Sequence, residues 1–262
     1  MAWVDVPGSS GVWKYENTAT AANTYSDSGA GANSVFSGGI RTYTKPGTSD
    51  TVTVYARTRI KGEINQYTMS EEFDNTDWTK SNTTVTANST ADPNGDITAD
   101  TMSENIGISK KELYQLTNFV SGTQYTMSVF AKTNGRHLQL QPAGGIAGAT
   151  NFANFNLTTG TLGTVGAGAD NATIKDYGNG WFRCSITMTS SITSLTGVGI
   201  LLIENDTDAR GYAYSGDETS GIFVWGAMLS EGAVVKRYIK TTNSASTTIE
   251  RGELSKTYYD NQ

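Results

Sequence analysis

The residue types best suited to chemistry in this chain are polar side chains set two positions apart. His137, Gln139 and Gln141 alternate with leucines, and Asn154 and Asn156 alternate with apolar residues in a second stretch. In a β-strand, residues two apart point to the same face. Amides supply both hydrogen-bond donors and acceptors, which suits a ligand with vicinal hydroxyls. If both strands belong to one sheet, the five side chains share its outer face. A solvated sheet face is the alternative, and it is the commoner one.

Candidates for catalysis are few. His137 is the single histidine, so a Ser-His-Asp triad would have to use it, and no Gly-x-Ser-x-Gly segment accompanies it. Cys184 lies in an apolar strand, where a buried, inert thiol is expected. A glycosidase needs two carboxylates held several ångströms apart, and the sequence does not exclude such a pair among its scattered acids. These acids are Glu71, Glu72, Asp74, Asp77, Glu204, Asp206, Asp208, Asp217 and Glu218. We expect a protein without enzymatic activity.

Composition and charge exclude several other classes. The chain has 262 residues, 17% of them charged, and a formal net charge of −6, so attraction to nucleic acid is not expected. One cysteine and one histidine exclude an internal disulfide and a Cys/His zinc site. No apolar run approaches the roughly 18 residues of a membrane span. Because the N-terminus lacks the basic and apolar regions of a signal peptide, we expect assembly inside a cell.

The elements that must position these side chains are short strands. They are separated by turns rich in Gly, Asn, Asp and Ser, and no clear helical segment lies between them. Several alternate with period two, as a half-buried strand does. The clearest are 123–132, 136–142, 151–158, 180–188, 197–204 and 221–229. This pattern predicts an all-β fold, a β-sandwich or jelly roll.

The start of the chain forms a separate, smaller pattern. Residues 51–60 are β-branched and alternating, and 37–44 give a weaker strand signal before the turn cluster at 45–50. The two stretches predict a hairpin within a small β-rich unit. We therefore divide the chain into that unit at 1–63, a jelly roll at 64–245 and a C-terminal tail at 246–262.

An ordered series of motifs runs through the middle of the chain. It opens at 65–78 with a strand, the step Glu71-Glu72-Phe73 and then Trp78. It continues through 86–88, 91–95, 125–132, 179–184, 214–217, 221–232 and 237–242. This series covers about two-thirds of the chain. It resembles the carbohydrate-binding-module-like jelly rolls of tail, fibre and other surface proteins of tailed bacteriophages.

The resemblance implies a structural virion protein displayed on the particle surface and assembled in the host cytoplasm. It implies weak, multivalent binding of host-surface polysaccharide through His137, Gln139, Gln141, Asn154, Asn156 and Trp78. It also implies contacts with other virion proteins through the N-terminal unit. The protein would form a homo-oligomer, and a trimer is the usual arrangement in fibres. Two alternatives stay open: a capsid or tail decoration protein that binds no glycan, and a small polysaccharide depolymerase.

The tryptophans and acids of the series have further expected roles. We expect Trp181 and Trp225 to pack in the core rather than stack on sugar. Trp78 lies in a polar context that favours stacking more, although the family often packs this residue under a loop. No cofactor is expected, but jelly rolls of this kind often hold one structural calcium. By position, Glu71 and Glu231 would be its candidate ligands.

The flanks of the chain carry a second resemblance. Residues 1–59 and 251–260 resemble small virion-associated proteins of marine phages, in which the two stretches follow each other more directly. This implies that the jelly roll is inserted near Gly62 and that 246–262 returns to complete the first unit. Insertions succeed at exposed turns when the inserted domain has neighbouring ends.

Overall fold

The computed structural model describes residues 2–5, 13–16, 39–44, 51–56, 63–243 and 246–248. The chain divides into two compact units, one of residues 62–249 and one of the residues on either side. Most of the tail at 246–262 lies outside the described residues, so its return to the first unit stays a prediction. Among the described residues, no helix is long and apolar enough to cross a membrane.

The first unit is β-structured in its described part. Strands β1 (Ala2–Asp5) and β2 (Trp13–Glu16) pair antiparallel. Strands β3 (Gly39–Thr44) and β4 (Thr51–Ala56) also pair antiparallel, with Ile40 opposite Tyr55. The hairpin predicted from the β-branched stretches is therefore confirmed.

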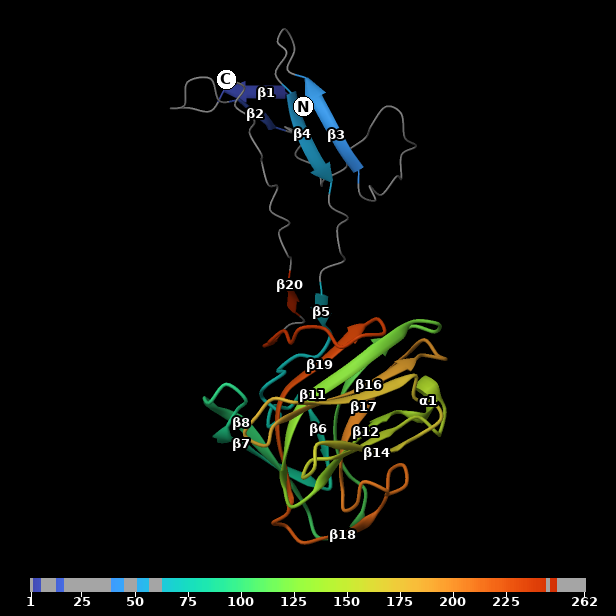
Figure 1. The fold of residues 1–262 in the computed structure, drawn as a ribbon. Helices are drawn as coiled ribbons and strands as arrows, with labels where there is room; N and C mark the ends of the chain where they lie inside the picture. Colours follow the sequence, from blue (N-terminus) through green and yellow to red (C-terminus); the bar gives the residue numbers. More distant parts are fainter. Residues whose placement is uncertain are drawn as a thin grey trace. The chain divides into compact units, whose positions relative to one another are not determined.

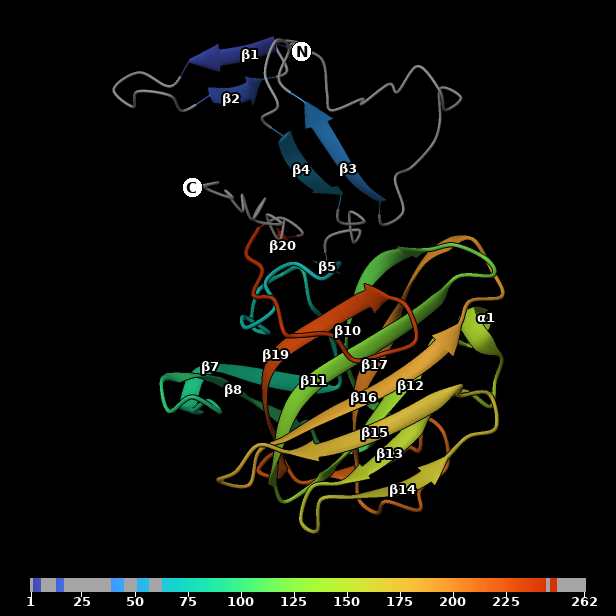
Figure 2. The same ribbon diagram turned by 45° about the horizontal axis from the view of Figure 1, so that its top comes forward.

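The second unit is a sandwich of two antiparallel six-stranded sheets, which confirms the predicted all-β jelly-roll class (Figure 1). Sheet 1 has the order β14-β13-β12-β17-β10-β6. Its strands are β6 (Thr79–Ser81), β10 (Lys111–Phe119), β12 (His137–Pro142), β13 (Ala153–Asn156), β14 (Thr161–Val165) and β17 (Ser194–Ile203). Sheet 2 has the order β15-β16-β11-β19-β8-β7 (Figure 2). Its strands are β7 (Thr83–Ala91), β8 (Ile97–Glu104), β11 (Gln124–Asn134), β15 (Asn171–Asp176), β16 (Phe182–Thr189) and β19 (Gly221–Glu231).

Smaller elements complete the sandwich. A one-turn helix, α1 (Gly144–Ala147), follows β12. Strands β9 (Gly107–Ser109) and β18 (Tyr214–Gly216) form a short ribbon. Strands β5 (Glu63–Asn65) and β20 (Ser246–Thr248) form another, with Ile64 opposite Thr247. The chain therefore enters and leaves the sandwich side by side.

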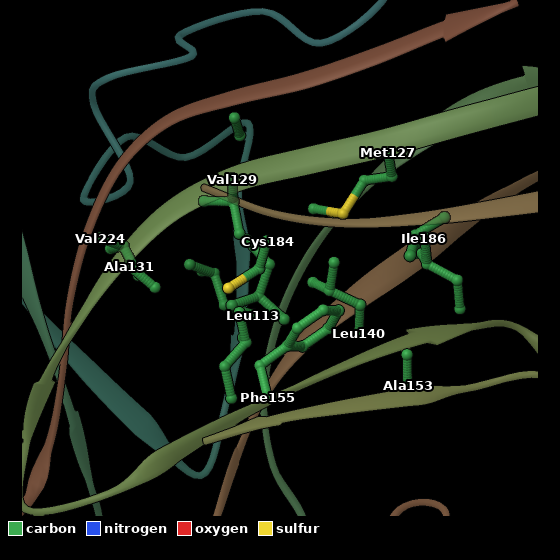
Figure 3. Close-up of a cluster of buried hydrophobic side chains, with 14 of the residues drawn as sticks. Leu113, Met127, Val129, Ala131, Leu140, Ala153, Phe155, Cys184, Ile186 and Val224 are labelled. Carbon is green, nitrogen blue, oxygen red and sulfur yellow. The ribbon is translucent and has the colours of Figure 1, made fainter. Parts of the chain in front are cut away.

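The core fills the space between the two sheets (Figure 3). Alternate residues of each strand supply it, as the period of two requires. Sheet 1 contributes Leu113, Leu138, Leu140, Phe155, Val198, Ile200 and Leu202, and sheet 2 contributes Met127, Val129, Ala131, Cys184, Ile186 and Val224. The residues between them in sequence face outward. The even-numbered positions of β10 and the odd-numbered positions of β12 and β17 therefore share the outer face of sheet 1.

Candidate functional site

A groove of about 480 Å³ lies on the outer face of sheet 1. Strand β17 forms its floor, because this strand lies between β12 and β10 in the sheet. The walls are β10 on one side and the end of β12 with the start of α1 on the other. The residues that line it are Lys110, Glu112, Tyr114, Leu116, Gln141, Ala143, Gly144, Thr196, Gly197, Gly199 and Arg210.

Two glycines lie on the floor of the groove. Gly197 and Gly199 flank Val198, whose side chain is in the core, so both lie on the outer face. Gly197 is paired with Leu116, and Gly199 is paired with both Tyr114 and Gln141. A Cβ at Gly197 would lie 2.6 Å from the backbone oxygen of its neighbour Gln115, and one at Gly199 would collide with the Glu112 carboxylate. Neither position has room for a side chain, and at Gly199 the space is taken by the Glu112 carboxylate and the Leu201 side chain.

One wall of the groove is aromatic and aliphatic. Tyr114 and Leu116 stand on β10, and the Leu116 side chain is 50% exposed. Leu195, diagonal to Leu116 across the sheet, is 60% exposed and extends this apolar strip beyond the groove. An apolar surface beside an open floor suits a ring that has one flat, non-polar face.

The opposite wall carries a buried acceptor that has no partner. Gln141 is only 6% exposed, and its Oε1 accepts no hydrogen bond within the described part of the chain. Leaving a buried polar atom unsatisfied costs about 1–3 kcal/mol. Gln141 lines the groove, but its Oε1 is itself buried beside Gly211, so a donor in the groove would satisfy this oxygen once the side-chain amide turns toward the groove.

One end of the groove is charged. Lys110 and Glu112 form an ion pair of 2.5 Å. Arg210 donates to two backbone oxygens, that of Pro142 at 2.6 Å and that of Asn151 at 3.2 Å. Burial lowers the pKa of Arg210, and the nearby Glu112 carboxylate opposes this effect. The guanidinium stays protonated, because arginine is not deprotonated in proteins.

The loop at 204–212, between β17 and β18, carries Arg210 and packs on the predicted polar row. Gln139 and Asn154 are paired across β12 and β13, as expected if the strands share a sheet, and both are fully buried. The Nε2 of Gln139 donates to Asn154 Oδ1 (2.7 Å) and to the backbone oxygen of Ala209 (3.1 Å), and its Oε1 accepts from the Gly211 N–H (2.7 Å). Asn154 donates to the backbone oxygens of residues 206 and 208. These two amides hold the loop in place.

Asn156 also supports this loop, whereas His137 holds the backbone just after β13. His137 Nδ1 accepts from the Leu157 N–H at 3.2 Å, and burial lowers the pKa of this imidazole. Asn156 donates to the Asp206 carboxylate at 2.8 Å. Of the five residues in the predicted row, Gln141 is the one that lines the groove. Their role in glycan binding stays a prediction, and the structure gives four of them a positioning task.

The three tryptophans of the motif series are all buried. Trp78 is 1% exposed, packs on Tyr67 and Phe73 with ring centroids 5.1 and 4.9 Å apart, and donates to the Met69 backbone oxygen. A sugar could not stack on it without unpacking this cluster. Trp181 and Trp225 form a second apolar cluster with Ala99 and Phe130, which confirms their expected packing.

The two glutamates predicted to bind calcium have different surroundings. Glu71 accepts from Lys240 Nζ at 2.6 Å and from the Tyr238 hydroxyl at 3.0 Å. Glu231 ends β19, opposite Tyr125. No group of three or more His, Cys, Asp or Glu side chains in the described part of the chain could hold a metal ion. Cys184 is fully buried, which raises the pKa of its thiol.

Sequence reasoning missed most of the groove. Tyr114 and Leu116 lie in β10, a strand that was not predicted, and Arg210 lies in a loop. The one available signal was the pair of glycines two apart in the predicted strand at 197–204. Glycine is unfavourable inside a strand, and its presence there often marks a close approach or a ligand.

The chain has little similarity to known proteins. No family model matches it, and no curated protein matches it. Among solved structures it is similar to the CBM22-1 and GH10 modules of Clostridium thermocellum endo-1,4-β-D-xylanase 10B, determined with xylohexaose. The identity is 15% and the TM-score 0.37, over 69% of this chain and 30% of that chain. The chain thus spans less than a third of that structure, and these values transfer no function to it.

Proposed function

We propose that the sandwich is a carbohydrate-binding module that takes a host-surface glycan into the groove of sheet 1. The observation that carries this proposal is the combination of a glycine floor, an aromatic wall at Tyr114 and the unsatisfied acceptor of Gln141. A pyranose has a non-polar face and a rim of hydroxyl groups. The non-polar face fits Tyr114 and Leu116, and a hydroxyl on the rim supplies the donor that Gln141 lacks.

The lining of the groove supports binding without catalysis. Glycoside hydrolysis needs two carboxyl groups placed on either side of the scissile bond. Glu112 is the one carboxylate among the residues that line the groove, and Lys110 neutralises it. The proposed activity is therefore recognition alone.

The motif series supports a wider proposal about where the protein works. On that basis we place it on the surface of a tailed-phage virion, assembled in the host cytoplasm. Its N-terminal unit would contact other virion proteins or its own copies, as in a trimer. Many copies on one particle would convert weak single-site binding into firm attachment.

The binding proposal is tested with polysaccharides extracted from bacterial envelopes, titrated against the full chain by calorimetry. We expect Tyr114→Ala and Gln141→Leu each to weaken binding about tenfold, the effect of losing roughly 1.4 kcal/mol. Tyr177→Ala is the matched control, because this tyrosine is 41% exposed and lies after β15 of sheet 2. It should bind like the parent chain.

Two other outcomes would replace the proposal. If no polysaccharide binds at millimolar site concentration, the sandwich is architecture, as in a decoration protein. If reducing ends are released from the polysaccharide, the protein is a depolymerase, and substituting Glu112 should then abolish the release.

The virion proposal has its own test. Antibody labelling of phage particles that encode the chain should place it on the particle surface. Its recovery only in the soluble fraction of the lysate would contradict this proposal, whatever the groove binds.

A further inference from the structure

Arg210 holds a positive charge at the groove, and the carboxylate that acts on this charge, that of Glu112, is already paired with Lys110. It donates hydrogen bonds to the backbone oxygens of Pro142 and Asn151, and it forms no ion pair within residues 63–243. These contacts use two of its N–H donors, and a guanidinium has more. The backbone contacts fix the guanidinium beside the groove and leave part of its donor fork free.

The other charged side chains at this end of the groove leave its net charge positive. Lys110 and Glu112 pair with each other at 2.5 Å, so their sum is zero and the end keeps one net positive charge. Two acids of the same loop are engaged elsewhere. Asp206 accepts from Asn156, and Asp208 accepts from the backbone N–H groups of Glu204 and Asn205. The groove therefore has a cationic end on a chain whose net charge is −6.

The positions of Arg210, Gln141 and Tyr114 indicate which chemical groups a ligand of the groove must carry. Gln141 and Arg210 both line the groove, with Tyr114 on the wall across β17. A ligand that satisfies all three needs a non-polar ring face, a hydroxyl donor and an anionic group on one molecule. Burial makes the anionic contact worth more, because Arg210 has lost part of its hydration.

We propose that the groove selects acidic glycans, with Arg210 binding a carboxylate of the sugar. This inference rests on the proposed function, since it names the class of glycan that the same groove takes. Because the chain as a whole is acidic, the selection is local: it comes from one oriented guanidinium and not from general attraction to polyanions.

The test compares each ligand with its own neutral form and uses the intact chain. Polygalacturonate, alginate and hyaluronan are titrated before and after reduction of their carboxyl groups to alcohols, beside neutral envelope polysaccharides. We expect at least one acidic polymer to bind roughly tenfold more tightly than its reduced form, the effect of one charge-assisted hydrogen bond. Raising the salt concentration should narrow the difference.

Protein variants then assign the difference to Arg210. Arg210→Gln should remove the preference, so that the acidic and reduced forms of the polymer bind this variant with affinities within about twofold of each other. Arg237→Gln, at an exposed arginine away from the groove, is the control with the same change in charge and should keep the preference. If Arg210→Gln does not fold, the comparison of acidic with reduced polymers on the parent chain still tests whether the groove selects acidic glycans.

The outcomes separate this inference from the proposed function. Equal binding of acidic and reduced polymers, or binding of neutral polysaccharides alone, overturns the inference and leaves the module a glycan binder. A preference that survives in folded Arg210→Gln also overturns it. Failure of every polymer, acidic, reduced and neutral, overturns both.

Discussion

Asp100 is a buried carboxylate that ties two irregular segments to β8. It accepts from the Phe73 N–H at 2.8 Å and from the Asn88 N–H at 2.9 Å, and the residue is 1% exposed. Burial raises its pKa to about 6, and the nearby Asp74 adds to this, while the backbone hydrogen bonds oppose it. The folded protein therefore binds a proton at Asp100 more readily than the unfolded chain does.

This shift predicts a pH dependence of stability. A carboxylate with a raised folded pKa contributes most below its unfolded value near pH 4, and loses that contribution as the pH rises through about 6. Relative to Asp100→Asn, the parent chain should lose roughly 2–3 kcal/mol of unfolding free energy between pH 4 and pH 7. Urea unfolding of both proteins at four pH values measures this. If the difference in unfolding free energy between the parent chain and Asp100→Asn is the same at all four pH values, the prediction is contradicted.

At the scale of elements, the loop at 204–212 gives two glutamines on one strand different tasks. Gln139 and Gln141 are the same residue type on the same face of β12, two positions apart. Gln139 makes three hydrogen bonds, two of them to the loop and one to Asn154, whereas Gln141 has an acceptor without a partner. The difference comes entirely from a loop more than sixty positions away in the chain.

The same change at each glutamine should therefore have different effects on stability and on binding. Gln139→Leu removes the bonds to the loop and should lower the unfolding free energy by about 2–4 kcal/mol. Gln141→Leu removes an unsatisfied acceptor and should change stability by less than about 1 kcal/mol, while it weakens glycan binding. Thermal unfolding of the two variants measures the contrast. Equal losses of stability would show that the loop does not depend on Gln139.

Sequence patterns predict the elements whose alternation is clean. Strands β11, β12, β16, β17 and β19 were found to within a few residues, because apolar residues recur along them with period two. Strand β10 was missed because Lys111, which is fully buried and donates to Gly107 and Ser109, stands at an inward position. Strand β8 likewise ends in buried Glu104, which pairs with Arg136. A buried charge at an inward position interrupts the apolar alternation by which a strand is recognised in the sequence.

The site was less predictable than the fold for a related reason. The polar row was found correctly as one face of one sheet, but which part of that face is open depends on the loop that covers Gln139 and Asn154. Gly197 and Gly199 signal a close approach, yet the sequence does not say which side chains stand beside them. A groove is a property of several strands at once, whereas a sequence pattern describes one strand at a time.

At the scale of the whole molecule, the sandwich has the features of an independent folding unit. Residues 62–249 form one compact unit with its own core, and the ribbon of β5 and β20 brings its two ends together. We expect residues 62–249, expressed alone, to unfold in one cooperative transition and to bind glycan as the full chain does. Calorimetry and glycan titration check both. A fragment that is soluble but shows no unfolding transition would mean that the sandwich needs the first unit.

The ribbon of β5 and β20 also has a mechanical consequence. If the tail returns to the first unit as predicted, a sandwich pulled by a bound ligand transmits the load through two covalent strands at once, and each carries part of the tension. The hydrogen bonds between antiparallel strands lie across the direction of this pull, so tension along the ribbon does little to open them. A domain attached through two segments also resists rotation about the axis of its attachment, whereas a domain on a single linker rotates freely.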